Sequence, residues 1–558
     1  MNQTKWIIAF KLAALISITA PAQGAGPNLP DPPKPVKEPL YGSYPDSQVD
    51  FPLTIDQLPS TLHKPWNELA SGNLPTSVAS ISGQSEDPKL TLFNLQQAFD
   101  LFAWQTFIAL NWPADPEIFG KPDPQHKIGQ ASHADRLWET FISPANVFKA
   151  DGAKPDAYVP TFSRTNKLHA IGKRTHTLDE VDEAFFDMEK PLPPIVDTNK
   201  QYARYEIRLN KVAYDYIVSG AKVKDTHYPL YNREDQNAFL DQGGVITFPD
   251  GTIEVKVAWK KLGEGDNPNK FFTQVVDVYE NPYADPVVVN KDVTYGMVGM
   301  HIMYLVDGIP QWVWPTFEHV DNAPLADLRQ GRRKITGEWR VIESDDVKHW
   351  APGPVKSRYN FFNLASNHAE FNSSIGGFSP SSRESMEKHN PRTNANPDYY
   401  QPEYERLPSQ ITKVITVNNE ITVSKWTYAL NEEVHRRLSA IEPDSVWANY
   451  RLTTTQWPSD PGLTASWQQY YARANALIKE WNKKNPGDKR PLLKMSAGTV
   501  KAGNPAPVSL GNAVAETYMQ INGSCMNCHS GATFGGPNGK RADSNFSFML
   551  QRAKPTRK

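Results

Sequence analysis

The sequence predicts an α+β protein with a β-rich central region, buried helices and a mainly α C-terminal region. Apolar and polar residues alternate around Asp-Gly turn signals in the centre, which predicts strands. Residues 91–110 are apolar around most of a helical circumference, which predicts a buried helix. Apolar residues recur at helical spacing in the last third of the chain. With 558 residues, 39% of them hydrophobic and 11% aromatic, the chain can bury a large core.

Composition divides the chain into regions, and the 47 prolines indicate many rigid or extended connections. The predicted regions are a signal peptide at 1–25, an extended Pro-rich arm at 26–90, an α+β region with central hairpins at 91–350, a loop-rich linker or lid at 351–410 and a C-terminal region at 411–558.

The first 25 residues have the order of a secretory signal. Lys5 and Lys11 precede an apolar stretch, and Ala20 and Ala22 stand in the A-x-A relation that signal peptidase reads. A retained membrane anchor is the alternative, but the apolar stretch falls short of the ~20 residues that cross a bilayer. No other apolar segment approaches that length, which predicts no transmembrane segment in the mature chain. Removing residues 1–25 changes the net charge from −2 to −4, and so small a charge predicts no nucleic-acid partner.

Apolar patterns place further elements in order along the chain. Expected helices after 91–110 cover residues 201–219, 430–441, 465–482, 511–522 and, with Ser544 as N-cap, 544–550. Expected strands cover residues 245–260 as a hairpin, then 271–279, 337–342 and 410–423.

A second hairpin is expected between residues 295–306 and 311–319, because two runs of β-forming residues flank Asp307-Gly308. Side-chain alternation puts His301 on one face and Met300 on the other. An even loop places His301 with Trp314 and Glu318, and places His319 with Met300; an odd loop exchanges these sets.

The two cysteines form Cys525-Met-Asn-Cys528-His529, the C-x-x-C-H signature of covalent c-type haem attachment. The thiols add to the haem vinyl groups, and His529 supplies an axial iron ligand. A thioredoxin-like redox pair would start a helix after a strand, whereas this motif lies 29 residues from the C-terminus. A zinc site would need two more ligands from a chain with no other cysteine. The predicted signal peptide supports haem attachment, because covalent attachment of haem is a feature of exported proteins.

Only 29 residues follow His529, so upstream chain must help to surround the haem. Met549 lies 20 residues beyond His529 and is a candidate for the sixth iron ligand, which would favour an electron carrier. The alternative is that Met549 is a core methionine. An open sixth position would instead favour small-molecule binding or catalysis.

The central hairpin supplies the candidate catalytic residues His301, Glu318 and His319, because imidazole and carboxylate side chains suit proton transfer and metal binding. They could form an acid/base group over the haem, ligate its iron or hold a separate metal. The alternative is a core hairpin whose polar side chains pair with each other and with the backbone.

The sequence resembles a group of large exported bacterial monohaem proteins of the cytochrome c family. The resemblance spans nearly the whole mature chain and rests on residues 99–107, on 298–302 followed by 312–319, on 447–452 with 455–458, and on 516–520 before Cys525. It implies a bacterial, periplasmic protein with covalent haem at Cys525, Cys528 and His529, and it implies no particular reaction.

Three functions follow from these observations. The first is periplasmic electron transfer by one covalent haem, with a redox partner protein or a small-molecule reductant or oxidant. The second is a haem-dependent oxidoreductase with a substrate pocket between the haem and the hairpin of His301, Glu318 and His319. The third is a haem-based sensor of a ligand or gas. A carrier needs roughly 100 residues around its haem, so the remaining chain must have a further task.

Overall fold

The structure is a computed structural model. It describes residues 27, 29, 60–78, 88–131, 134–158, 197, 199, 203–279, 289–307, 309, 311–322, 359–361, 421–458, 461–487, 489–490, 492, 505–506, 512–514, 525–535 and 541–556. Helices and antiparallel sheets are both present in these ranges, which confirms the mixed α+β class. No helix in them is both long and apolar enough to cross a bilayer.

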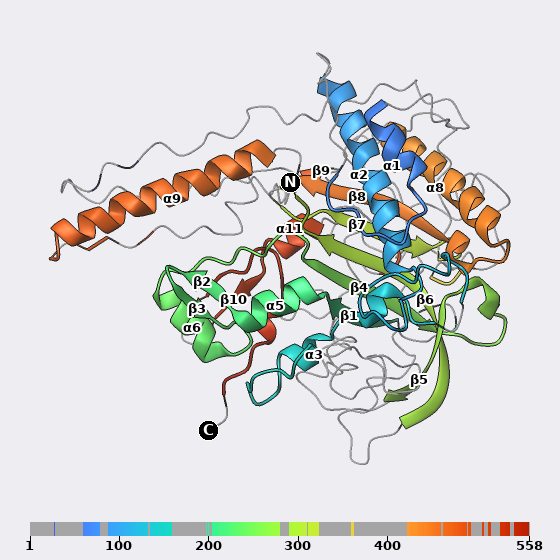
Figure 1. Cartoon of the computed structure of the whole chain (residues 1–558), viewed down its shortest axis with the longest axis horizontal. Coiled ribbons are helices and arrows are strands. Elements are labelled where there is room, and N and C mark those ends of the chain that lie inside the picture. The colour runs from blue at the N-terminus through green and yellow to red at the C-terminus, as the bar shows by residue number, and fades with distance from the viewer. Residues whose placement is uncertain are drawn as a thin grey trace, which may run out of the picture.

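A seven-stranded antiparallel sheet is the centre of the fold (Figure 1). Its strands lie in the order β1-β4-β6-β7-β8-β9, and β5 pairs with the first part of the long strand β6. The bounds are β1 Arg204–Leu209, β4 Ile253–Lys261, β5 Thr273–Tyr279, β6 Val289–Tyr304, β7 Trp314–His319, β8 Tyr450–Pro458 and β9 Pro505–Ala506. Strand β8 comes from the predicted C-terminal region, so that region contributes to the same sheet as residues 204–319.

Alternation along the strands gives the sheet two faces. The helix face carries Val255, Met300, Ile302 and Phe317, which belong to the largest apolar cluster. The C-terminal face carries the residues between them, namely Glu254, Lys256, His301, Met303, Trp314 and Thr316. His301 is opposite Thr316 and Tyr304 is opposite Val313, which is the even-loop register of the predicted hairpin.

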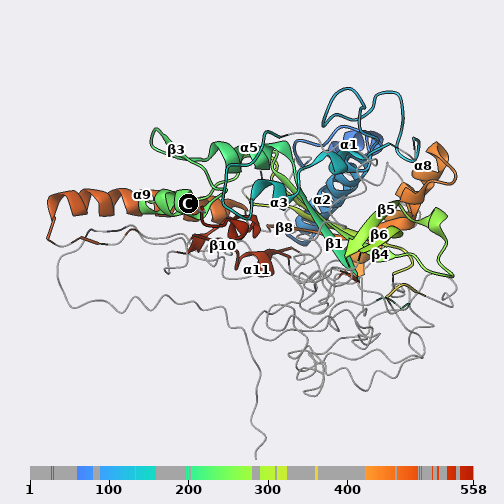
Figure 2. The same ribbon diagram turned by 90° about the horizontal axis from the view of Figure 1, so that it is seen from below.

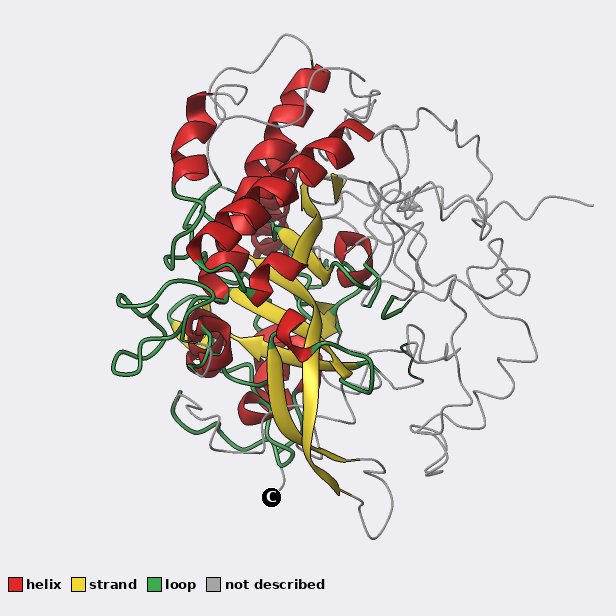
Figure 3. Cartoon of the chain, turned by 90° about the vertical axis from the view of Figure 1, so that its right-hand side faces the viewer, coloured by secondary structure: helices red, strands yellow, loops and turns green. Residues whose placement is uncertain are grey.

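The helix face is covered by α2 (Pro88–Leu110) and α8 (Ile421–Ile441), as Figures 2 and 3 show. Helix α2 buries residues from 96 onwards on nearly every side, as predicted for an all-round apolar helix. Trp104 Nε1 donates to Asn431 Oδ1 on α8 at 3.0 Å, and the Phe107 ring stacks on Phe317 at 4.2 Å. These contacts fix two helices and the sheet as one packed unit.

The C-terminal face is covered by short elements from two distant parts of the chain. From upstream come α5 (Lys211–Ser219), α6 (Arg233–Asp241) and the hairpin β2 (Ala221–Val223) and β3 (Thr226–Tyr228). From the C-terminus come α11 (Cys525–His529), the hairpin β10 (Thr533–Phe534) and β11 (Ala542–Asp543), and the 3-10 helix η10 (Met549–Arg552). Their apolar side chains form a second cluster with Met303 and Trp314.

The remaining described elements are peripheral to the candidate site. They are η2 (Ser60–Leu62), α1 (His63–Asn67), η3 (Leu137–Thr140), α3 (Pro144–Val147), η4 (Pro268–Lys270), η9 (Val446–Asn449) and α9 (Pro461–Lys484).

The prediction of one helix over residues 201–219 is wrong in its first half, where β1 lies. Asn210 ends the strand because its side-chain Oδ1 accepts from the Ala213 backbone N–H and caps α5. The predicted hairpin at 245–260 is also wrong: β4 pairs with β1 and β6, and residues 245–249 form no strand. Ser544 is not a helix N-cap, because η10 starts after Phe548.

Several predictions are confirmed at the level of the element. These are the helices at 91–110, 430–441 and 465–482, the strand at 271–279 and the central hairpin. Residues 421–423, expected as strand, belong to α8. The signal peptide, the linker or lid at 351–410 except 359–361, the strand at 337–342 and residues 515–522 lie outside the described residues. Because the described C-terminal part contains β8 as well as α8 and α9, a mainly α region is not shown.

Candidate functional site

The cysteine motif forms a single helical turn, α11, against the C-terminal face of the sheet. Cys525 is buried, Cys528 is exposed and His529 is partly exposed. The Met526 backbone N–H donates to Oε1 of the buried Gln456 on β8 at 2.9 Å. The first N–H groups of a helix have no partner within the helix, and here the Gln456 side chain accepts from one of them. This hydrogen bond fixes α11 on the sheet.

His529 has a defined orientation and proton position. Its Nδ1 lies 2.9 Å from the backbone oxygen of Phe546. Because a carbonyl oxygen only accepts, Nδ1 carries the hydrogen and Nε2 of the neutral ring carries the lone pair. Metal-binding histidines are typically held in this way, with one nitrogen donating to a carbonyl and the other nitrogen on the metal.

The loop that offers this carbonyl has a strained backbone. Asn545 and Phe546 have φ values of 52° and 65°, in the left-handed region. Such a conformation costs on the order of 1–3 kcal/mol in a residue other than glycine, and it persists only where the surroundings impose it. Trp312 Nε1 donates to the Asn545 oxygen at 2.8 Å, and the Asn545 N–H donates to Asp543 Oδ1 at 2.6 Å. These bonds hold the loop in the shape that turns the Phe546 carbonyl toward His529.

Aromatic rings from the sheet and the C-terminal loop surround the imidazole of His529. The Trp314 ring of β7 lies 4.7 Å from it between centroids, and the Phe548 ring lies 5.0 Å away. Trp314 is 3% exposed and also meets Phe546 at 6.3 Å. The histidine thus lies between the predicted central hairpin and the last loop of the chain.

The structure brings His301 to the same face as His529. His301 is partly exposed, and its Nε2 lies 3.0 Å from Thr316 Oγ1. Thr316 Oγ1 also accepts from Asn512 Nδ2 at 2.9 Å, so its own hydrogen can be donated to His301. Desolvation first, and then the positive charge of Lys256, lower the pKa of His301 to about 3. His301 is therefore neutral at pH 7.

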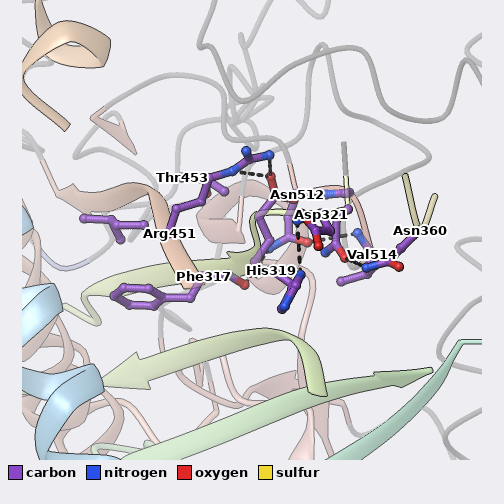
Figure 4. Close-up of polar contacts among 12 residues, drawn as sticks. Phe317, His319, Asp321, Asn360, Arg451, Thr453, Asn512 and Val514 are labelled. Atoms are coloured by element: carbon purple, nitrogen blue, oxygen red, sulfur yellow. Dashed lines mark hydrogen bonds and ion pairs between the residues drawn. The ribbon is translucent and has the colours of Figure 1, made fainter. Parts of the chain in front are cut away.

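Glu318 lies on the same face but has other partners. Its Oε1 accepts from Arg451 Nη2 at 2.6 Å, and its Oε2 accepts from the Ala513 N–H at 2.9 Å. Figure 4 shows Arg451 and Asn512 on this side of β7. Gly299, opposite Glu318, permits the approach of residues 512–514, since a Cβ there would meet Val514 at 2.6 Å. Glu318 joins three segments and its contacts give a catalytic role no support.

His319 is fully buried and lies on the opposite side of β7 from Glu318. Its ring stacks on Phe271 with centroids 4.2 Å apart, its Nε2 lies 3.0 Å from the Lys270 oxygen, and its Nδ1 accepts from the Asp321 N–H at 3.1 Å. The structure therefore does not bring His319 to His301 and His529, and its catalytic role remains a prediction without support from these contacts.

Met549 begins η10 and is 4% exposed. It belongs to the same apolar cluster as Cys525, Met526 and Phe546. The structure thus places the predicted sixth ligand in the cluster that contains the cysteine motif, and its ligation remains a prediction.

Sequence reasoning missed Glu254, a buried carboxyl on the C-terminal face. Ser547 Oγ, in the loop beside Phe546, donates to Glu254 Oε1 at 2.6 Å. Burial raises the pKa of Glu254 to about 7, against smaller lowering effects of Ser547 and Arg552. The available signal was a glutamate within the alternating apolar run of β4, and that signal alone does not identify Ser547 as its partner.

Within the ranges that the structure describes, no three His, Cys, Asp or Glu side chains gather as a metal-binding group. No protein-family model, curated protein or solved structure matches this chain.

Proposed function

We propose that this chain is an exported c-type cytochrome with one haem, attached covalently to Cys525 and Cys528 and ligated by His529, that transfers single electrons in the bacterial periplasm. The observation that carries the proposal is the hydrogen bond from His529 Nδ1 to the Phe546 carbonyl. It fixes the tautomer in which Nε2 can bind iron, in the residue that the C-x-x-C-H motif assigns to iron.

The residues present fit such a group. Both thiols and the imidazole belong to one helical turn, so a single planar group can be attached and ligated there. Bound haem would supply one-electron chemistry. The chain itself orients His529 through Phe546, fixes α11 through Gln456, and packs Trp314 against the imidazole. The proposal includes a mainly α C-terminal region around the haem and a redox partner protein or small redox molecule.

One observation favours a second function, a haem-dependent oxidoreductase. His301 is partly exposed and lies on the face that carries α11, so its imidazole could form a hydrogen bond with a substrate bound beside the haem. In the electron carrier Met549 or His301 would supply a second iron ligand besides His529, and in the oxidoreductase that position would stay open to a substrate.

Covalent attachment is tested by replacing both cysteines, Cys525→Ser with Cys528→Ser. We expect complete loss of the haem stain after denaturing electrophoresis, whereas Met526→Leu, in the same helical turn, keeps it. A haem that remains attached in the double variant would refute the assignment.

An optical spectrum of the purified protein with and without carbon monoxide separates the two functions. A low-spin spectrum that carbon monoxide leaves unchanged supports the carrier, and rapid binding supports the oxidoreductase. Met549→Leu and His301→Gln then identify the sixth ligand, because loss of the true ligand converts the low-spin spectrum to a high-spin one. Recovery of the haem-stained protein in the periplasmic fraction tests the localisation.

A further inference from the structure

The C-terminal face contains a continuous row of aromatic rings that starts at His529. Its centroid distances are 4.7 Å from His529 to Trp314, 6.5 Å from Trp314 to Trp312, 5.7 Å from Trp312 to Phe248 and 4.8 Å from Phe248 to Tyr216. Each ring contacts the next, so the row crosses the apolar cluster without a gap.

The row runs from the interior to solvent. Trp312 is fully buried, and Trp314 and Phe248 are each 3% exposed. Tyr216, on α5, is partly exposed, and its hydroxyl accepts from the Thr247 N–H at 3.0 Å. The far end of the row therefore lies at the molecular surface, on a helix upstream of the cysteine motif.

We infer that Trp314, Trp312, Phe248 and Tyr216 form an electron path between the haem ligand His529 and the surface at α5. This inference rests on the proposed function. Indole and phenol rings lose an electron more readily than benzyl or aliphatic side chains, so Trp314, Trp312 and Tyr216 can carry the charge in turn. The Phe248 ring bridges Trp312 and Tyr216 by contact. In each transfer the iron would change from Fe(II) to Fe(III), and a strongly oxidising one-electron acceptor at α5 would gain the electron. Tyr216 would release its phenol proton to solvent when it is oxidised and take one back when it is reduced, so no proton is exchanged overall.

The path has features that plain core packing does not require. Trp312 donates its indole N–H to the backbone oxygen of Asn545, in the loop that orients His529. The same residue thus holds the haem-ligand loop and continues the ring contacts outward. Tyr216 keeps its proton at neutral pH, because burial raises its pKa to about 12. The surface end is therefore an uncharged ring.

The two cysteines make a site-specific test possible. Asp215, next to Tyr216, has a side chain that is 49% exposed, and Asp215→Cys adds the one thiol left when haem occupies Cys525 and Cys528. A photoactive ruthenium polypyridyl complex is bound to this thiol. A flash with a diffusing quencher oxidises the label, which then takes an electron from the reduced haem protein.

In the haem-loaded protein we expect Trp312→Phe to slow haem oxidation by roughly tenfold, which about 1.4 kcal/mol of added barrier produces. Trp112→Phe is the matched control, because Trp112 also donates its indole N–H to a backbone oxygen, that of Asp123. Tyr216→Phe is a surface variant that keeps the ring and removes the oxidisable phenol, and it should also slow the transfer. Unchanged rates in Trp312→Phe and Tyr216→Phe would overturn the path and would mean that electrons leave beside the exposed Cys528.

A second readout needs no haem. In the full chain with Cys525→Ser, Cys528→Ser and Asp215→Cys, the oxidised label should produce a tryptophan radical, seen by transient absorption and electron paramagnetic resonance. Adding Trp312→Phe with Trp314→Phe should abolish the radical, and adding Trp112→Phe should not. A radical that persists in the first case refutes the path whether or not the chain binds haem.

Discussion

The two faces of the central sheet are both buried and aromatic, but they are assembled differently. The helix face is covered by α2 and α8, each longer than 20 residues. The C-terminal face is covered by α11 with 5 residues and η10 with 4, in a segment that includes two left-handed residues. Long helices carry much of their hydrogen bonding internally, whereas short segments depend on side chains such as Gln456 and Trp312. The helix face is therefore stabilised mainly by its own long helices. The C-terminal face instead holds the residues of the candidate site in place through side-chain hydrogen bonds.

The largest expected effect is a loss of stability when one aromatic ring is removed from either face of the sheet. The haem spectrum then shows which of the two rings also belongs to the candidate site. Phe107→Ala on α2 and Trp314→Ala on β7 should each lower the free energy of unfolding by about 3–5 kcal/mol, because each removes a buried ring. We expect only the Trp314 variant to change the haem spectrum, since only that ring contacts His529. Chemical denaturation and absorption spectra measure the two quantities.

The milder pair Phe107→Leu and Trp314→Phe keeps more of the apolar volume if the alanine variants do not fold. A spectral change in folded Phe107→Leu as large as that in Trp314→Phe would show that the two faces are not functionally distinct.

The next effect uses one buried carboxyl on each face. Burial raises the pKa of Asp100 on α2 to about 6 and that of Glu254 on β4 to about 7, from ordinary values of 3.8 and 4.5. Between these limits the folded chain binds more protons than the unfolded chain, so stability falls as the pH rises. We expect Glu254→Gln to remove up to about 3 kcal/mol of this fall between pH 4.5 and 7, and Asp100→Asn to remove a similar amount between pH 3.8 and 6.

Denaturation midpoints measured from pH 4 to pH 8 check this result. His301 acts in the opposite sense, because a lowered histidine pKa makes stability rise with pH. The contribution of His301 is the same in the parent and in each variant, so it cancels when the stability of the variant is subtracted from that of the parent at each pH. If neither Asp100→Asn nor Glu254→Gln reduces the fall in stability with pH, the carboxyls do not titrate as their surroundings indicate.

The smallest effect tests the strained loop. Asn545→Ala should destabilise the protein by about 1 kcal/mol, because alanine tolerates the left-handed region poorly, whereas Asn545→Gly should be nearly neutral. Thermal unfolding measures the difference. Equal melting temperatures for the two variants would mean that the loop relaxes, and that its backbone conformation is not imposed by the surrounding structure.

The features predicted correctly from the sequence are those that a local pattern of residues determines. All-round apolarity identified α2, alternation identified β6 and β7, and the even-loop alternative of their register is the one observed. Spacing alone identified Cys525, Cys528 and His529 as a candidate site. Alternation within residues 204–209 was mistaken for helical spacing because Asn210, which begins the real helix, was not recognised as a cap.

Other features depend on contacts that the sequence does not record. Strand β8 joins β7 across more than 130 residues, and Ser547 meets Glu254 across 293. The Phe546 carbonyl is selected by backbone geometry, to which its side chain gives no clue. Of the three hairpin residues proposed for chemistry, alternation could separate His319 from His301, but it could not show that Arg451 binds Glu318.

The C-terminal segment packs on parts of the chain that are synthesised before it. Its last turn is held by residues made much earlier: Gln236 donates to the Leu550 oxygen at 2.9 Å and Arg233 to the Ala553 oxygen at 2.9 Å. The chain is synthesised from its N-terminus, so strands β1 and β4 to β9 of the sheet are made before the cysteine motif. Under the proposed function, haem would be attached to a segment that packs against a sheet whose strands are synthesised first.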